Sequence, residues 1–135
     1  KDLMVIARIE SLILNKGLAD AERRADAYLD AGSDAIMIHS KDSNPKEIFK
    51  FSNKFKKKYK DIPLVVVPTS FYRVKESQLI DNGFNMIIYA NHLLRASYPA
   101  MQLVANSILK NKRTFEIEKK LLSIKEILKL IPGTT

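Results

Sequence analysis

Polar side chains suited to binding or catalysis directly follow short apolar runs at four places in the sequence. They are the guanidinium of Arg8, the imidazole of His39 with the hydroxyl of Ser40, the hydroxyls of Thr69 and Ser70, and the amide of Asn91 with the imidazole of His92. An arginine binds a phosphoryl or carboxylate group through two parallel hydrogen bonds, and a neighbouring histidine can donate to the same anion or move a proton. The pattern indicates a site for a small anionic substrate.

Arg8 and His39 are the main candidates for catalytic work. Arg8 follows five apolar residues, where burying its charge would be costly unless it meets an anion. Two alternatives to catalytic roles stay open. Arg8 can form an ion pair with Glu10, and His39 can be an ordinary histidine at the edge of a sheet. The hydroxyls at 69–70 are equally suited to capping the next helix. His92 precedes a helix and is compatible with an exposed turn.

Several familiar kinds of site are absent from the sequence. None of the four glycines forms a GxG pair, so there is no glycine-rich phosphate loop. The chain has no cysteine, which excludes thiolate metal sites and a cysteine nucleophile. Glu10 is the only carboxylate at a strand end, and one carboxylate is a poor site for a hard divalent cation. The sequence predicts no metal site within the chain.

The elements that must position these residues alternate between strands and helices. Apolar runs predict strands over 3–7, 35–38, 64–67 and 85–90. Helical spacing and stop signals predict helices over 18–31, from Asn44 and Pro45 onward, and over 74–82, 93–111 and 115–131.

Four successive strand–helix units predict a parallel sheet in the α/β class, because right-handed helical crossovers return each strand in the same direction. A complete (β/α)8 barrel takes about 250 residues, so the chain corresponds to about half of one. The alternative is a small open α/β sheet with helices on both faces. The first and last strands carry no edge-blunting charge or proline, which favours a missing partner.

Composition and charge indicate a globular domain and raise one competing function. Hydrophobic residues make up 46% of the chain, and no apolar run approaches the roughly 20 residues of a membrane span, so we expect a cytoplasmic protein without membrane contact. The net charge is +8, and residues 41–60 hold eight lysines against two acidic residues. A basic nucleic-acid-binding module is therefore one alternative. The helical spacing of Ile48, Phe51, Phe55 and Tyr59 favours a buried aromatic stripe with solvated lysines.

The residues around the strand ends resemble the phosphoenolpyruvate mutase family of the isocitrate lyase and phosphoenolpyruvate mutase superfamily. The matching blocks are VIARIE at 5–10, GSDAIMIHS at 32–40, VVPT at 66–69, YANHLLRA at 89–96 and LSIKEI at 122–127. They extend over nearly the whole chain.

The resemblance implies that residues 1–135 form a single unit, the second half of a (β/α)8 TIM barrel with strands five to eight. It implies an isomerase that interconverts phosphoenolpyruvate and phosphonopyruvate with Mg²⁺, in which Arg8 and His39 contact the migrating phosphoryl group and Ser40 and Asn91 help to bind the substrate. It also implies a last helix swapped between subunits, and hence a homo-oligomer. The apolar stripe along 117–131 agrees with that helix.

The resemblance also implies what the chain lacks. The family's magnesium-binding carboxylates and mobile gating loop belong to the first half of the barrel, so we expect Mg²⁺ ligands outside this chain and an inactive isolated segment. A phosphonopyruvate hydrolase of the same family is the nearest alternative function.

Overall fold

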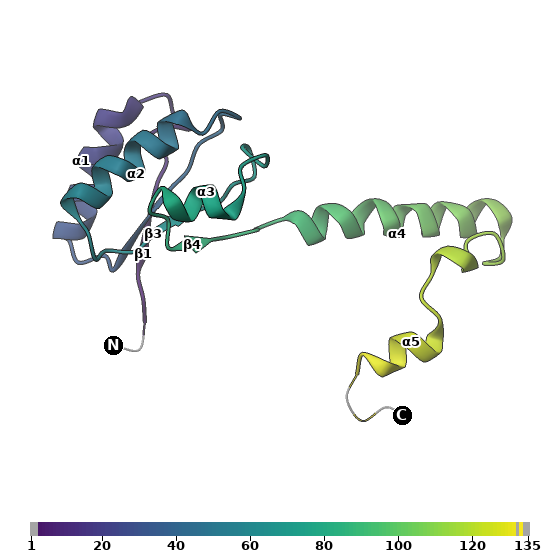
Figure 1. Cartoon of the computed structure of the whole chain (residues 1–135). Helices are drawn as coiled ribbons and strands as arrows, with labels where there is room; N and C mark the ends of the chain where they lie inside the picture. Colours follow the sequence, from purple (N-terminus) through teal and green to yellow (C-terminus); the bar gives the residue numbers. More distant parts are fainter. Residues whose placement is uncertain (1–2, 132, 134–135) are drawn as a thin grey trace. The chain divides into compact units, whose positions relative to one another are not determined.

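The computed structural model describes residues 3–131 and 133, and these residues form two compact units (Figure 1). The division falls between Ala90 and Asn91. The first unit holds a β-sheet with its helices, and the second unit is helical. Among the described residues, no helix combines the length and the apolar character that crossing a membrane requires.

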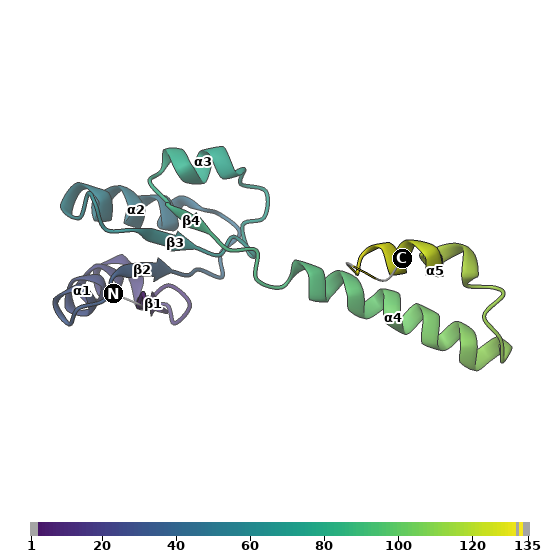
Figure 2. The same cartoon turned by 90° about the horizontal axis from the view of Figure 1, so that it is seen from below.

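The first unit is built on a four-stranded parallel sheet. Its strands are β1 (Ile6–Ile9), β2 (Ala35–Ile38), β3 (Leu64–Val66) and β4 (Met86–Ile87). They pair in the order β1-β2-β3-β4, and Figure 2 shows β3 and β4 side by side from below. The parallel α/β sheet is therefore confirmed. A doubly wound sheet reverses its strand order at one point, and this sheet does not.

Three helices cover one face of this sheet (Figure 1). They are α1 (Gly17–Asp30), α2 (Lys46–Lys58) and α3 (Glu76–Asp81). All three contribute to a single buried cluster with alternate residues of the strands, such as Ile36 and Ile38 of β2. Because successive strand residues point to opposite faces, the intervening residue Met37 lies on the face away from the helices.

The first strand begins and ends later than the sequence predicts. We expect a strand over 3–7 followed by Arg8, whereas β1 is Ile6–Ile9 and contains Arg8. The pairing partner determines the difference, because β2 begins at Ala35 and its register matches Ile6 with Ala35. Arg8 is tolerated within the strand because its side chain is exposed.

The lysine-rich segment, residues 41–60, contains the buried aromatic stripe that the sequence predicts. Ile48, Phe51 and Phe55 are at most 5% exposed, and the rings of Phe51 and Phe55 stack with centroids 5.8 Å apart. Lys54 and Lys58 pair with acidic side chains of α1. Aromatic rings inside the core are not available to stack on bases, which removes the main support for a nucleic-acid groove.

The structure corrects the expected start of this helix, because its N-cap residue is Pro45 rather than Asn44. The side chain of Asn44 accepts a hydrogen bond of 3.1 Å from the backbone N–H of Lys46. The helix begins at Lys46, one residue after the expected Pro45.

Gly83 ends α3 at a position where any side chain is expected to be destabilising. Its φ is +85°, and an added Cβ would lie 2.8 Å from Cγ of Lys56. Gly32 has a φ of +95° but open space around it. We expect Gly32→Ala to lower the free energy of unfolding by about 1–2 kcal/mol through backbone strain, and Gly83→Ala by more. Urea unfolding of both variants measures the difference; equal losses would mean that Lys56 moves aside at no cost.

The second unit consists of α4 (His92–Asn111), a 3₁₀ turn (Glu118–Lys120) and α5 (Ile124–Lys129). The helix predicted over 93–111 is confirmed within a residue. The continuous helix predicted over 115–131 is wrong, because the chain is extended at Leu121 and restarts at Ser123. The Ser123 hydroxyl accepts from the N–H of Glu126, whose carboxylate accepts from the N–H of Ser123. This reciprocal cap starts a new helix. The predicted stop at Pro132 lies outside the described residues.

Candidate functional site

Arg8 lies in β1 on the sheet face away from the helices. Its neighbour Ile9 is fully buried in the core, and strand geometry turns Arg8 to the opposite face. The Nε of Arg8 pairs with a carboxylate oxygen of Glu10, and their side chains are 49% and 39% exposed. The ion pair considered from the sequence is therefore present. Its exposure leaves the guanidinium accessible to an incoming anion.

His39 follows β2 directly and lies close to this ion pair. Its backbone N–H donates to the carbonyl of Ile9 at 3.3 Å, which links it to the neighbouring strand. The ring is partly buried, and within the described part of the chain its Nδ1 atom is buried without a hydrogen-bond partner. Burial is the main cause that lowers the pKa of His39; Arg8 lowers it further and Glu10 raises it. The imidazole is therefore neutral at neutral pH.

The stability of the fold is expected to depend on pH through His39. Because its pKa in the folded chain lies below the ordinary value of 6.5, unfolding takes up a proton below pH 6.5. The free energy of unfolding should fall as the pH drops through this range, and the contribution of His39 should be constant above it. Urea unfolding from about pH 5 to 8 measures this fall, and His39→Gln should reduce it. An identical pH dependence in the variant would contradict the prediction.

Ser40 follows His39 but turns its hydroxyl into the loop between β2 and α2. The residue is 2% exposed, and its hydroxyl accepts from the backbone N–H of Asp42 at 3.1 Å. Asp42 in turn accepts from the N–H of Asn44 at 2.9 Å. Such side-chain bonds to nearby backbone groups fix a loop in one conformation. In this chain Ser40 therefore fixes the segment that carries His39, and its role toward a substrate stays a prediction.

Asn91 belongs to the second unit and precedes α4. Its side chain makes no capping hydrogen bond, and within the described residues its Oδ1 atom is buried without a partner. The structure brings Arg8, Glu10 and His39 together in the first unit. His92 begins α4 and is exposed. The role of Asn91 stays a prediction.

The loop after β3 holds the other predicted hydroxyls. Thr69 and Ser70 do not cap α3, since its N-cap residue is Lys75. Ser70 lines a cavity of about 290 Å³ with four other residues of the loops after β2 and β3. The others are Ser43, Phe71, Tyr72 and Arg73.

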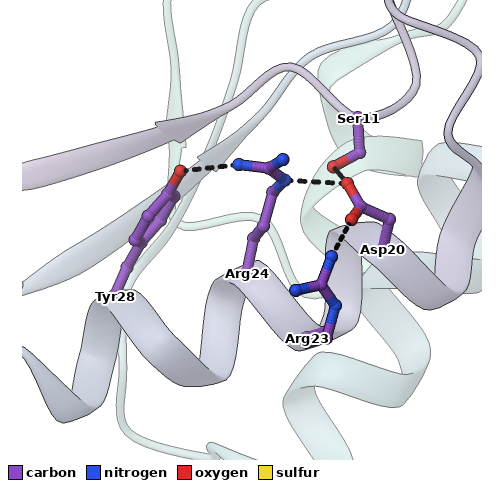
Figure 3. Close-up of polar contacts among 5 residues, drawn as sticks. All are labelled: Ser11, Asp20, Arg23, Arg24 and Tyr28. Carbon is purple, nitrogen blue, oxygen red and sulfur yellow. Dashed lines mark hydrogen bonds and ion pairs between the residues drawn. The ribbon is translucent and has the colours of Figure 1, made fainter.

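Sequence reasoning missed a polar cluster that includes Ser11, the residue directly after Glu10. Figure 3 shows the carboxylate of Asp20 between the hydroxyl of Ser11 and the guanidinium groups of Arg23 and Arg24. Ser11 and Arg24 each donate to the same oxygen at 2.7 Å. These bonds lower the pKa of Asp20 to about 2. The spacing of Asp20 and Arg24 is a signal for a helical ion pair, but the partnership with Ser11 depends on the fold.

The described residues do not form a magnesium site. No group of three or more histidine, aspartate and glutamate side chains in this part of the chain could hold a metal ion. The carboxylate that influences the pKa of His39 is that of Glu10, which is paired with Arg8. A hard divalent cation takes several oxygen ligands, and this cluster offers one carboxylate.

Comparisons with known proteins agree on one family. The model of the phosphoenolpyruvate phosphomutase family matches residues 1–109. A phosphoenolpyruvate phosphomutase from Tetrahymena pyriformis is 38% identical over 129 residues, which cover 96% of this chain and 42% of that protein. A phosphonopyruvate hydrolase from Variovorax sp. (strain Pal2) is 38% identical over 131 residues, covering 96% of this chain and 44% of the relative.

Solved structures give the same result. The crystal structure of a phosphoenolpyruvate phosphomutase from Streptomyces platensis subsp. rosaceus superposes with a TM-score of 0.86 at 39% identity, covering 96% of this chain and 44% of that one. The structure of a phosphonopyruvate hydrolase in complex with oxalate and Mg²⁺ superposes with a TM-score of 0.82 at 38% identity, covering 96% and 45%. The chain thus spans less than half the length of these relatives.

Proposed function

Because the chain belongs to the phosphoenolpyruvate phosphomutase family, we propose that it supplies the C-terminal half of a (β/α)8 barrel isomerase that interconverts phosphoenolpyruvate and phosphonopyruvate. In this reaction the bond from phosphorus to carbon breaks and a bond from phosphorus to the enol oxygen forms, or the reverse. The activity belongs to the larger protein that contains this chain, because the chain spans less than half of its relatives.

The observation that carries this proposal is the cluster of Arg8, Glu10 and His39 at adjacent parallel strands. An incoming phosphoryl group takes two hydrogen bonds from the terminal nitrogens of the Arg8 guanidinium, whose Nε stays paired with Glu10. The neutral imidazole of His39 hydrogen-bonds to the same group. Both stabilise the charge that spreads over the phosphoryl oxygens during transfer. Ser40 and Asn91 are proposed to complete substrate binding.

The half-barrel is supported by the order of the strands and by the distribution of the helices. Strands that pair in chain order, with the three helices of the first unit on one face, are typical of a barrel wall. On the other face Arg8, Met37, Val65 and Met86 form one row across the four strands. Of this row, Arg8 and Met86 are exposed and Val65 is fully buried, and none of the four belongs to the core cluster that the helices form with the sheet. In a complete barrel the row faces the interior.

The proposed enzyme binds Mg²⁺ through residues outside this chain, since the described residues offer no ligand set. The metal is proposed by analogy with the relative that was solved with oxalate and Mg²⁺. Magnesium would neutralise charge on the substrate oxygens. The chain contributes Arg8 and His39 on the phosphoryl side.

The second unit is proposed to mediate homo-oligomer formation through a C-terminal helix swapped between subunits. Among its described residues only Ile117 is buried, and large apolar side chains such as Leu93 and Phe115 are 88% and 77% exposed. An apolar groove of about 490 Å³ runs along α4 beside Ile117 and Leu121. These surfaces support a partner helix, and α5 of another subunit is the proposed one. Cytoplasmic localisation stays a prediction.

Phosphorus NMR of the full-length protein with phosphonopyruvate and Mg²⁺ tests the proposed activity. We expect phosphonopyruvate to be converted to phosphoenolpyruvate without release of inorganic phosphate. Formation of inorganic phosphate alone would identify a phosphonopyruvate hydrolase, which the equal identity to the Variovorax relative keeps as the second candidate. Absence of both products would contradict both functions.

A further inference from the structure

Ser11 is a buried polar residue at the start of the turn that joins β1 to α1. It is 1% exposed, and its hydroxyl donates to Oδ2 of Asp20 at 2.7 Å. Arg24 donates to the same oxygen at 2.7 Å, and Arg23 pairs with the other oxygen (Figure 3). Asp20 is in the first turn of α1. The first helix therefore holds the turn through one carboxylate.

The turn that Ser11 anchors is compact. The backbone N–H of Leu14 donates to the carbonyl of Glu10 at 3.0 Å, and that of Lys16 donates to the carbonyl of Ser11 at 2.8 Å. Leu12 is 4% exposed and packs in the core. Glu10 stands directly before Ser11, so the anchor also restricts the backbone of Glu10.

Glu10 in turn contacts the guanidinium of Arg8. The side chain of Arg8 is about half exposed, and Glu10 is its hydrogen-bond partner. A continuous chain of contacts thus leads from Asp20 through Ser11 and Glu10 to Arg8.

We propose that Asp20 is a positioning residue for the reaction: through Ser11 it holds Glu10 where Glu10 orients the guanidinium of Arg8 toward the phosphoryl group. This inference rests on the proposed function only for the identity of the group that Arg8 binds. The orientation of Arg8 is a property of the chain itself and is open to measurement without substrate.

A purely structural role for Asp20 must be distinguished, since an acidic residue in a first turn stabilises any helix. Asp26 is the matched control on the same helix. It pairs with Lys58 at 2.8 Å and accepts from the hydroxyl of Tyr59 at 2.8 Å, both from the end of α2 rather than from the turn before α1. Asp26→Asn removes a comparable charge from α1 without touching Ser11.

The imidazole of His39 reports the arrangement, because Arg8 lowers its pKa and Glu10 raises it. We would follow the ring protons by NMR against pH in the unmodified chain, Asp20→Asn and Asp26→Asn, with His92→Gln to assign the two histidines. We expect a lower titration midpoint for His39 in Asp20→Asn, since Glu10 moves away while Arg8 stays in β1. The midpoint in Asp26→Asn should equal that of the unmodified chain.

Ser11→Ala and Ser11→Thr test the same link if Asp20→Asn fails to fold. We expect a lower His39 midpoint in Ser11→Ala. In Ser11→Thr, which keeps the hydroxyl, we expect the midpoint of the unmodified chain. An unchanged midpoint in both Asp20→Asn and Ser11→Ala, or an equal shift in Asp26→Asn, would overturn the inference. No substrate is present, so the result is independent of whether the full-length protein is a mutase.

Discussion

Replacing Arg8 by lysine is expected to lower the turnover of the full-length enzyme on the order of 100- to 1,000-fold, the cost of losing one preorganised donor to a developing charge. Lysine keeps the positive charge but presents a point charge in place of a planar fork. It can no longer give two parallel hydrogen bonds to the phosphoryl oxygens, and it loses the Nε contact with Glu10. Steady-state kinetics with phosphonopyruvate and Mg²⁺ measure the effect.

Arg113→Lys is the matched control for this substitution. Arg113 pairs with Glu116 in the second unit and is exposed, so the same exchange of guanidinium for ammonium should leave turnover within about twofold, as is usual for surface positions. Near-normal turnover in Arg8→Lys would mean that Arg8 does not bind the phosphoryl group. Arg8 would then serve only as the ion-pair partner of Glu10.

The 135-residue chain by itself is expected to show no conversion of phosphonopyruvate, a complete loss relative to the full-length protein. The physical reason is the missing metal site, because the described residues hold no group of three potential ligands. Calorimetric titration of the chain with Mg²⁺ should show no stoichiometric binding, whereas the full-length protein should bind the ion. Phosphorus NMR under the same conditions should show unchanged phosphonopyruvate.

The His39 titration provides the control for this experiment, because a depressed midpoint shows that the first unit of the isolated chain is folded. Stoichiometric Mg²⁺ binding by the folded chain would contradict the placement of the ligands outside it. Turnover by the chain alone would contradict the half-barrel proposal as well.

The sequence predicts the bounds of a strand well where a local apolar run alone determines them. The run Ala35–Ile38 is apolar throughout, and β2 has these same bounds. The limits of β1 were predicted less well, because they depend on the register with β2 and not on the apolar run itself. The buried face of α2 was predicted correctly because its aromatic residues recur at helical spacing.

The break in the second unit and the contacts of Asp20 show two different limits of sequence reasoning. The cap formed by Ser123 and Glu126 has a sequence signal, a serine followed three residues later by a glutamate. The apolar stripe across this position favours a continuous helix instead. The bond between Ser11 and Asp20 joins a strand end to a helix across a turn. It depends on tertiary packing, which local pattern does not encode. Glu10 as the partner of Arg8 was among the expected alternatives, and the structure contains that pair.

The order β1-β2-β3-β4 has a consequence for how the first unit is made. Each strand pairs with the one synthesised just before it, so every new β–α segment finds its neighbour already present when it emerges from the ribosome. Contacts between segments close in sequence lower the contact order, which favours rapid folding. The sheet can therefore form strand by strand from the N-terminal side during synthesis. No strand of this sheet needs to stay exposed until a partner strand is made much later.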